Sequence, residues 1–381
     1  MNKKLLIVIG AIIVTILVLF IIISQQGAIA AFTFNSNNAL VIGASLSLTG
    51  KTASYGEDIR NGMELAVDHI KESKTPLNIR ILYDDTGSSL EKAVISAQKF
   101  IEVDGAKVII NVGADDVLTT APVTEAKGVI LFSPIAGSDN VDSAGKYVFR
   151  NRESSKLTAY ALAELLAMSG YKKVALFVAS SSSSPASYEQ AFIEKFPLLG
   201  GNIVLDFHYN ENQPDIRTGI LKAIDADASA VYVVASKDKD GAKVVQQLKE
   251  LGYEGLIVGG PALETTNFFV AAKEAAEGVI IASPPVDLNA PNAKQILETY
   301  KAKYGREMSF SAANAFDMVN LLNAAAGKCE SDTDCTKEYL LFVKDYPGIG
   351  GKTTFNPNGG VTKPLSLKIA KDGKFVPYPA Q

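Results

Sequence analysis

Strand and helix patterns alternate along this chain from Leu40 to about Ser283. Short apolar runs of the kind that buried strands use are followed by loops rich in Gly, Ser, Asp or Pro, and then by apolar residues at helical spacing. The first unit shows this most clearly, because its helical stripe consists of Ile59, Met63, Val67 and Ile70. Repeated βα units with short connections predict an α/β fold with a mostly parallel sheet covered by helices.

The polar loop between the first strand and its helix has two interpretations. In an open α/β sheet, loops at the carboxyl ends of the strands bind ligands, and the first N–H groups of a helix there lack partners. The loop is therefore either one wall of a ligand site or a plain connection built from turn-forming residues. Its own sequence favours neither interpretation.

A second set of βα units begins near Lys156. A helix at 156–168, a strand at 173–178 and a run of serines at 180–184 repeat the plan of the first half, where Ser89 is expected to cap a helix and residues 119–127 are expected to form a weak one. Further on, a strand is expected at 230–235 and a strand-like segment at 364–369. We interpret the serine run as a loop that opens onto a cleft. The tail from residue 292 adds helices but no strands for a third sheet, so these helices are expected to pack on an existing sheet. The pattern predicts two α/β lobes joined by several chain crossings, which act as a hinge beside a cleft.

Composition argues against nucleic-acid binding and leaves one question about the cysteines. The 381-residue chain has a net charge of −4 and no basic block, so the electrostatic footprint of a nucleic-acid partner is missing. Cys329 and Cys335 lie in the polar stretch CESDTDC, and both histidines are remote in sequence, so a zinc site is not expected. A local disulfide is favoured if the compartment is oxidising, with two free thiols as the alternative.

The N-terminus predicts export. Two lysines precede an apolar run from Leu5 to Ile23, which marks passage through a membrane with the lysines on the inner side. The run is about as long as a membrane-spanning helix, whereas Ala28-Ile29-Ala30 resembles a cleavage site. Residues 1–30 are therefore either a retained membrane anchor, which we favour, or a cleaved signal. Residues 31–38 are predicted to be a linker, and the rest is expected to lie outside the cytoplasm.

No catalytic motif stands out. The sequence contains neither a G-x-S-x-G nor an H-E-x-x-H pattern. Gly351-Lys352-Thr353 ends like a phosphate loop, but Tyr346 stands where that loop needs its first glycine. The pair Asp84-Asp85 either holds a metal or caps or bonds the loop that follows it, and the second is favoured because no denser acidic cluster is visible. We therefore expect no enzymatic activity, no cofactor and no metal.

Several short motifs together resemble one known family, and their order and spacing are more specific than any one of them. They are Ile42-Gly43 through Leu48-Thr49-Gly50, Tyr55-Gly56, Tyr83-Asp84-Asp85, Ser133-Pro134-Ile135-Ala136, Phe149-Arg150, Tyr300, Tyr304, Ala315-Phe316-Asp317, and Gly350 to Phe355 with Gly359. From about Ala39 to the C-terminus, the chain resembles the type I periplasmic binding proteins of the branched-chain amino-acid (Leu/Ile/Val) binding family.

The resemblance implies two Rossmann-like lobes that close on a small solute. Residues 39–150 plus 284–350 would form the first lobe, and residues 151–283 plus 351–381 the second. Members of this family usually deliver their solute to an ABC-type permease in the membrane, and some act as sensors. We therefore expect an extracytoplasmic protein, anchored or secreted, whose partners are such a permease and a small solute such as an amino acid or amide. A sensor with the same clamp and, less favoured, an extracellular enzyme are the alternatives.

The resemblance also implies a set of ligand-binding residues. These are Tyr55, Asp115, Asp116, Ser133, Ala136, Gly137 and Ser138 in the first lobe, and Ser184, Tyr188 and Glu264 in the second. The chain departs from the family at Asp115 and Asp116, which stand about where hydroxyl groups hold the ligand's carboxylate; Thr119 or Thr120 could substitute. Because buried aspartates repel a carboxylate, aspartates in the cleft would select a cationic ligand or a neutral hydrogen-bond donor. In the alternative interpretation, both face solvent or cap the next helix.

Overall fold

The computed structural model describes residues 39–180, 182–211 and 213–379. The predicted anchor or signal at 1–30 and the predicted linker at 31–38 lie outside these residues. Among the described residues, no helix is both long and apolar enough to cross a membrane. The compact unit from Leu40 to Gln381 contains every helix and strand given below.

The first sheet has five strands, all parallel, in the order β2-β1-β3-β4-β5. They are β1 (Leu40–Leu46), β2 (Ile79–Asp85), β3 (Val108–Asn111), β4 (Ile130–Ser133) and β5 (Val148–Arg150). Successive side chains of a strand point to opposite faces, so Leu40 and Ile42 enter one core while Val41 packs in the other. The prediction of an α/β fold with a mostly parallel sheet is confirmed.

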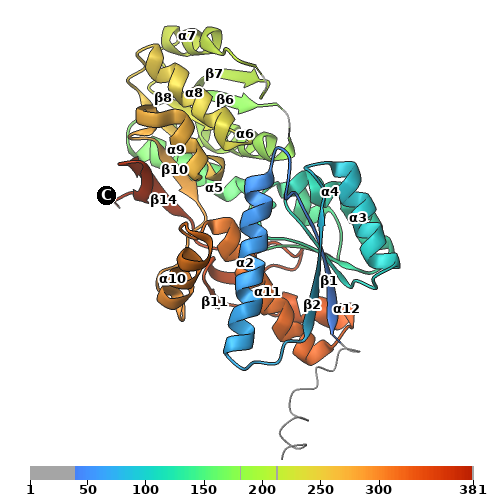
Figure 1. Cartoon of the computed structure of the whole chain (residues 1–381). Coiled ribbons are helices and arrows are strands. Elements are labelled where there is room, and N and C mark those ends of the chain that lie inside the picture. Colours follow the sequence, from blue (N-terminus) through green and yellow to red (C-terminus); the bar gives the residue numbers. More distant parts are fainter. Residues whose placement is uncertain (1–38, 181, 212, 380–381) are drawn as a thin grey trace, which may run out of the picture. The chain divides into compact units, whose positions relative to one another are not determined.

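Helices cover both faces of the first sheet (Figure 1). One face carries α2 (Ala53–Glu72), α10 (Ala293–Tyr304), α11 (Phe310–Cys329) and α12 (Thr333–Leu341), and the other carries α3 (Leu90–Glu102) and α4 (Ala114–Ala126). Gly62 lets α2 and α11 approach closely, because a Cβ there would lie 2.1 Å from the Ala312 carbonyl oxygen. The tail helices thus pack on an existing sheet, as expected.

The second sheet has seven strands in the order β15-β14-β10-β9-β8-β6-β7. They are β6 (Lys173–Ala179), β7 (Asn202–Tyr209), β8 (Ala230–Val234), β9 (Leu256–Gly259), β10 (Ile280–Ser283), β14 (Ser366–Lys371) and β15 (Lys374–Pro377). The strands from β6 to β10 pair in parallel, whereas β14 and β15 pair antiparallel. The sequence predicted β14 about two residues early and did not predict β15.

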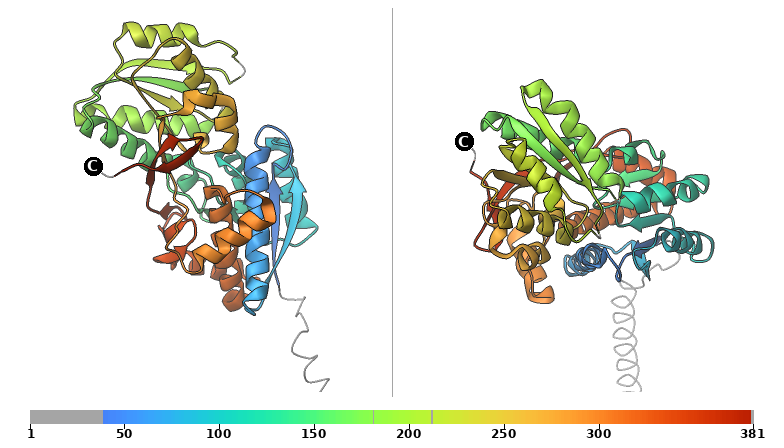
Figure 2. Two further views of the ribbon diagram at one scale, coloured as in Figure 1. Left: turned by 60° about the vertical axis from the view of Figure 1, so that its left-hand side comes forward. Right: turned by 90° about the horizontal axis from the view of Figure 1, so that it is seen from above.

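Helices also cover both faces of the second sheet (Figure 2). One face carries α5 (Ser155–Met168) and α6 (Ser183–Lys195), and the other carries α7 (Arg217–Asp225), α8 (Asp238–Glu250) and α9 (Thr266–Ala272). Short 3-10 helices complete the connections: η2 (Asp139–Ser143), η3 (Pro197–Leu199), η4 (Pro261–Leu263) and η5 (Lys273–Ala276).

A small antiparallel sheet lies near the last chain crossing. It consists of β11 (Tyr346–Gly348), β12 (Gly351–Phe355) and β13 (Val361–Thr362). Phe355 and Val361 belong to the same core as Phe132 and Phe149 of the first sheet. We therefore propose that the chain crosses to the second lobe after Thr362, rather than after residue 350 as the sequence suggested.

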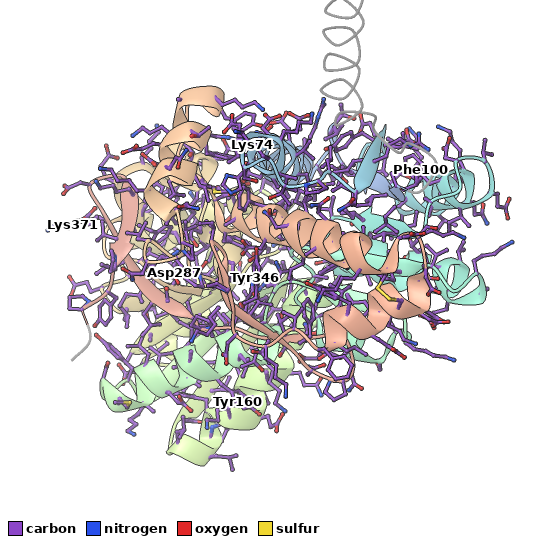
Figure 3. The ribbon with its side chains drawn as sticks, turned by 90° about the horizontal axis from the view of Figure 1, so that it is seen from below. Lys74, Phe100, Tyr160, Asp287, Tyr346 and Lys371 are labelled. Carbon is purple, nitrogen blue, oxygen red and sulfur yellow. A yellow bond between two sulfur atoms is a disulfide. The ribbon has the colours of Figure 1, made fainter. Side chains whose placement is uncertain are left out.

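Cys329 and Cys335 form a disulfide between the end of α11 and the start of α12. The bond is visible in yellow beside these two helices in Figure 3. No free cysteine occurs among the described residues. The favoured interpretation of the two cysteines is therefore confirmed, and the alternative of two free thiols is wrong.

Local polar contacts decide how several elements begin. Ser89 caps α3 by accepting a hydrogen bond from the Lys92 backbone N–H, as its position before a helical stripe predicts. Asp85 accepts hydrogen bonds from the backbone N–H groups of Leu48 and Thr49 and from the Thr49 hydroxyl. Asp85 also accepts a hydrogen bond from the Gly87 N–H at 2.9 Å, so it bonds the loop that follows it, as the favoured interpretation held.

Helix α4 starts earlier than its apolar pattern suggested. The sequence predicted a weak helix at 119–127, but the helix begins at Ala114. Gly113 precedes it in an extended conformation, and the Asp116 carboxylate accepts a hydrogen bond from the Gly113 N–H at 3.1 Å. This carboxylate contact stabilises the first turn. Asp115 and Asp116 therefore lie on a helix, not in a loop.

Candidate functional site

A cavity of about 330 Å³ lies where the carboxyl ends of the two sheets face each other. Its walls come from the loops after β1, β3, β8 and β9, the first turns of α4 and α6, and the crossing after β5. Because all strands of a parallel sheet end at the same edge, these loops from both lobes reach one place. The apolar part of the lining includes Val112, Ala114, Ile135, Val233 and Phe310.

Two aspartates of α4 line the cavity from the first lobe. Asp115 Oδ1 accepts a hydrogen bond from the Ser183 N–H, 3.2 Å away at the start of α6. Burial raises the pKa of the Asp116 carboxyl, and the nearby Asp115 charge raises it further. Among the described residues, no Lys or Arg nitrogen lies within 4 Å of either carboxylate. This end of the cavity therefore carries negative charge without a paired cation.

Arg152 lines the cavity from the first chain crossing and is only 6% exposed. Its guanidinium donates hydrogen bonds to the Ile135 carbonyl oxygen at 3.2 Å and to the Tyr188 hydroxyl. Its Nε lies 3.7 Å from a carboxylate oxygen of the fully buried Glu153, a distance that gives an ion pair but no hydrogen bond. The crossing therefore brings a buried cation with unused donors to the cavity.

Three tyrosines complete this end of the cavity. Tyr55, Tyr188 and Tyr232 all line it. Burial raises the pKa of Tyr55 and of Tyr232, so both phenols are neutral donors at ordinary pH. Tyr232 has no exposed surface, and its hydroxyl has no hydrogen-bond partner among the described residues.

A pair of opposite charges lines the cavity from the second lobe. Glu211 accepts hydrogen bonds from the Ser236 hydroxyl and from Lys237, with which it forms an ion pair. All three side chains line the cavity, and Lys51 lines it from the first lobe. Because Lys237 neutralises Glu211, these second-lobe side chains add hydrogen-bonding groups with little net charge, and Lys51 adds a positive charge from the first lobe.

The structure brings five of the residues expected from the sequence into the cavity lining and leaves five outside it. The five that line it are Tyr55, Asp115, Asp116, Ser184 and Tyr188. Asp115 and Asp116 both line the cavity, and the Asp116 carboxylate also bonds the Gly113 N–H at the start of its own helix.

The other five expected residues are not part of the cavity lining and make contacts elsewhere in the walls and lobes. Ser133 Oγ donates to the Val112 carbonyl oxygen and accepts from the Ala136 N–H, which fixes a turn after β4. Gly137 lies under the Arg152 guanidinium, and the Ser138 hydroxyl bonds that of Ser187 at 2.9 Å. Glu264 forms an ion pair with Lys368 and accepts from the Ser283 hydroxyl. The cavity lining therefore includes none of these five residues, which are Ser133, Ala136, Gly137, Ser138 and Glu264.

Sequence reasoning missed Arg152, Tyr232, Glu211 and Lys237. Lys237 follows a predicted strand at 230–235, so the rule that ligands meet the carboxyl ends of strands could have found it. Arg152 follows the recognised Phe149-Arg150 crossing by two residues, which is a weaker signal. Tyr232 lies inside a strand and looks like an ordinary core residue, so no sequence signal separates it from the core.

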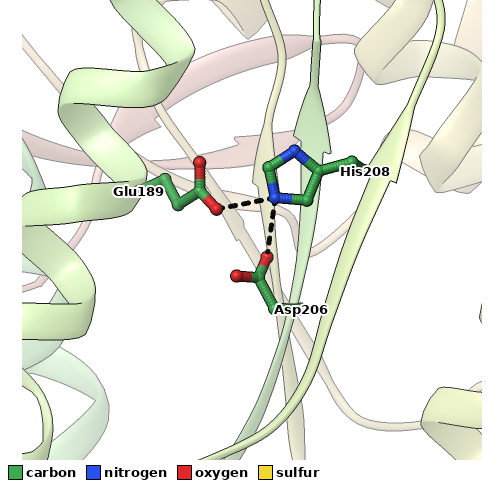
Figure 4. Close-up of side chains that lie close together, drawn as sticks. All are labelled: Glu189, Asp206 and His208. Carbon is green, nitrogen blue, oxygen red and sulfur yellow. Dashed lines mark ion pairs between the residues drawn. The ribbon is translucent and has the colours of Figure 1, made fainter.

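A second cluster of ionisable groups lies away from the cavity, between α6 and β7 (Figure 4). His208 Nε2 lies 2.8 Å from a Glu189 carboxylate oxygen and 3.5 Å from one of Asp206. Asp206 and His208 share one face of β7 because they are two residues apart. Burial raises the pKa of Glu189, and the adjacent Asp206 raises it further. The contacts of the His208 ring with the two carboxylates account for this arrangement, although the three groups could also hold a cation.

Known proteins match this chain over most of its length. The sequence model of the periplasmic binding protein family matches residues 39–374. A Leu/Ile/Val-binding protein of Rhizobium johnstonii is 25% identical over 356 residues, covering 91% of this chain and 95% of that protein.

Solved structures show the same fold. A leucine-binding protein from Thermotoga maritima has a TM-score of 0.83 at 24% identity, covering 90% of this chain and 98% of that one. The isoleucine complex of a branched-chain amino-acid binding protein from Streptococcus pneumoniae has a TM-score of 0.81 at 24% identity, covering 88% and 97%. These matches confirm the resemblance drawn from the sequence motifs.

Proposed function

Because the chain belongs to the periplasmic binding protein family, we propose that it clamps a small polar solute between its two lobes outside the cytoplasm and delivers it to an ABC-type permease. The observation that carries this proposal is the cavity of about 330 Å³, which loops of both sheets line together. A volume near 300 Å³ suits a small molecule, and polar groups converge on it from an otherwise apolar wall.

Binding works through the equilibrium between open and closed lobes. A solute that contacts both walls interacts more strongly with the closed form and so shifts the equilibrium toward it. Direct hydrogen bonds already join the lobes, among them Asp115–Ser183 and Ser138–Ser187. The closed form would present a surface that the permease distinguishes from the open form.

The residues that we assign to solute binding are those of the cavity wall. From the expected set we keep Tyr55, Asp115, Asp116, Ser184 and Tyr188, and we add Arg152 and Tyr232. We assign the other expected residues to the support of the wall, because they bond the turn after β4, the facing lobe or the end of the second sheet.

The same proposal assigns the boundaries of the two lobes and a role for the N-terminal segment. Residues 39–150 plus 284–362 form the first lobe, and residues 151–283 plus 363–381 form the second. Residues 1–30 act either as a retained membrane anchor near the permease or as a cleaved export signal. Since the family consists of solute-binding proteins, we propose binding without turnover of the solute.

Thermal unfolding of the full chain, purified in mild detergent, tests the proposal. A solute present at about 100 times its dissociation constant should add about 2.7 kcal/mol to the free energy of unfolding. The panel contains α-amino acids, ω-amino acids, amides, carboxylates, amines and sugars, each added at millimolar concentration. We expect at least one of them to raise the melting temperature in a saturable manner. If none does, the solute-binding proposal fails.

A further inference from the structure

The cavity is polarised, with negative charge at one end and hydrogen-bond donors at the other. Asp115 and Asp116 form the negative end, where no cationic side chain pairs with them among the described residues. Asp115 uses one oxygen for the Ser183 N–H, and Asp116 uses one for the Gly113 N–H. An ionised carboxylate accepts about four hydrogen bonds, so both retain capacity for a ligand.

The donor end consists of Arg152, Tyr188 and Tyr232. Arg152 has five N–H donors, of which two are taken by the Ile135 carbonyl and the Tyr188 hydroxyl. Because Glu153 balances the guanidinium charge, this end attracts an acceptor group through its donors rather than through net charge.

The Tyr232 hydroxyl is an independent sign of a ligand at this end. It lines the cavity, is fully buried and has no partner among the described residues. A buried hydroxyl without a hydrogen bond costs about 1–3 kcal/mol of stability, so a polar ligand atom is the natural partner.

The two ends contact different parts of helix α6. Asp115 bonds the backbone N–H of Ser183 at the start of this helix, and Arg152 bonds the side-chain hydroxyl of Tyr188, five residues later. The Arg152 guanidinium lies more than 4 Å from both aspartate carboxylates, and its charge is not among the groups that shift the pKa of Asp116. Between the two ends, Val112, Ala114 and Ile135 present apolar surface. A ligand whose polar groups stand at opposite ends of a short chain contacts two separated ends more readily than one that carries both groups on one carbon, because six bonds of an extended chain span about 7 Å.

We propose that the solute is an ω-amino carboxylic acid, a zwitterion whose ammonium and carboxylate groups stand at opposite ends of a short carbon chain. Its ammonium group bonds Asp115 and Asp116, and its carboxylate accepts from Arg152, Tyr188 and Tyr232. This inference rests on the proposed function and names its substrate class. It reverses the expectation from relatives that bind Leu, Ile or Val, because a carboxylate at the start of α4 would face two aspartates.

Titration calorimetry on the full chain tests the inference with four probes. They are 5-aminopentanoate, which has both groups; pentanoate, which lacks the ammonium; pentylamine, which lacks the carboxylate; and leucine, which carries both groups on one carbon. We expect 5-aminopentanoate to bind at least tenfold more tightly than each of the other three, because each of them leaves one end of the cavity without a partner.

Two variants assign the ends, each with a matched control. Asp116→Asn keeps the acceptor for the Gly113 N–H but removes the negative charge. It should therefore weaken the binding of 5-aminopentanoate at least tenfold and should not weaken the binding of pentanoate. The control Asp225→Asn removes a charge from the exposed surface of α7.

Tyr232→Phe should weaken the binding of 5-aminopentanoate about five- to tenfold without weakening the binding of pentylamine. Its control, Tyr209→Phe, removes another buried hydroxyl without a partner that does not line the cavity.

The outcomes separate the two proposals. If leucine binds more tightly than 5-aminopentanoate, or if Asp116→Asn does not weaken 5-aminopentanoate, the ω-amino acid assignment is overturned while the solute-binding function stands. If no solute of the wider panel binds, the function itself fails and the assignment fails with it. Both tyrosine variants should keep the wild-type melting temperature or raise it, since each removes an unsatisfied buried group.

Discussion

Replacing Lys363 with methionine is expected to lower the free energy of unfolding at pH 7 by about 1–3 kcal/mol, because it removes two buried hydrogen bonds and a charge that stabilises a buried carboxylate. Lys363 lies between β13 and β14, where the chain crosses between the lobes, and is 5% exposed. Its ammonium donates to Asn314 Oδ1 at 2.8 Å and to the Gly350 carbonyl oxygen at 3.1 Å.

The carboxylate in question is that of Asp317 on α11, which is 1% exposed. It accepts hydrogen bonds from the backbone N–H groups of Ile349 at 2.9 Å and Gly350 at 2.7 Å. Burial raises its pKa to about 6, while the Lys363 charge and these two N–H groups oppose that rise. Burial also lowers the pKa of Lys363 to about 8, so at pH 7 both groups are charged.

The pH dependence identifies the mechanism. The folded-state pKa of Asp317 lies above its ordinary value of 3.8, so its contribution to stability is fully present below about pH 3.8 and is lost as the pH rises through about 6. Without Lys363 the folded-state pKa rises further, and this loss becomes larger. The deficit of Lys363→Met relative to the wild type should therefore grow between pH 4 and pH 7.

Urea unfolding at both pH values measures this deficit. Lys352→Met, which removes an exposed lysine from β12, is the matched control and should stay within about 0.5 kcal/mol of the wild type. Equal losses for Lys363→Met at pH 4 and pH 7 would show that lost packing, not the unpaired charge, causes the effect.

Gly359→Ala is expected to cost more than about 4 kcal/mol or to prevent folding, because two independent effects act at one residue. Gly359 has a φ of +76°, in the left-handed region. A Cβ there would also lie 2.0 Å from the Val148 carbonyl oxygen of β5. The Gly359 carbonyl oxygen accepts from the Arg150 N–H at 3.0 Å, so the segment cannot move away without losing that bond.

Gly373→Ala separates these two effects. Gly373 has a φ of +73°, but a Cβ there would meet no atom within 4 Å. Its substitution should therefore cost only the backbone strain, about 1–2 kcal/mol. Urea unfolding compares the two variants. Similar losses for both would mean that the close approach of residue 359 to β5 contributes nothing.

Features set by short stretches of sequence could be predicted. The alternation of apolar runs and helical stripes gave the βα order, Ser89 was recognised as a cap, and the seven-residue stretch from Cys329 to Cys335 pointed to a local disulfide. Each depends on residues that are close in sequence. The start of α4 was missed because Asp116 stabilises the first turn through a side-chain contact that apolar spacing does not reveal.

The candidate site could be predicted only in part, for a related reason. Asp115 and Tyr188 lie next to recognisable strand ends or helix starts. Glu264 was expected in the cleft because it is the carboxylate nearest to the position where the resembled family pairs an acidic residue with the ligand's ammonium group, but Lys368 of the distant strand β14 pairs with it. Tyr232 differs from a core tyrosine only because its hydroxyl has no hydrogen-bond partner among the described residues. Only the folded structure reveals that difference.

Blocking the cavity tests most directly the central claim that the solute binds between the two lobes. Gly260 lines it, and a Cβ there would meet only Tyr188 ring carbons at 3.8 and 3.9 Å, so a larger side chain can enter without backbone strain. The measurement is a calorimetric titration of wild type and Gly260→Phe with whichever panel solute binds best. We predict one site per chain in the wild type and at least a 100-fold loss of affinity in the variant. Unchanged affinity in a folded Gly260→Phe variant would contradict the claim that the solute binds between the lobes.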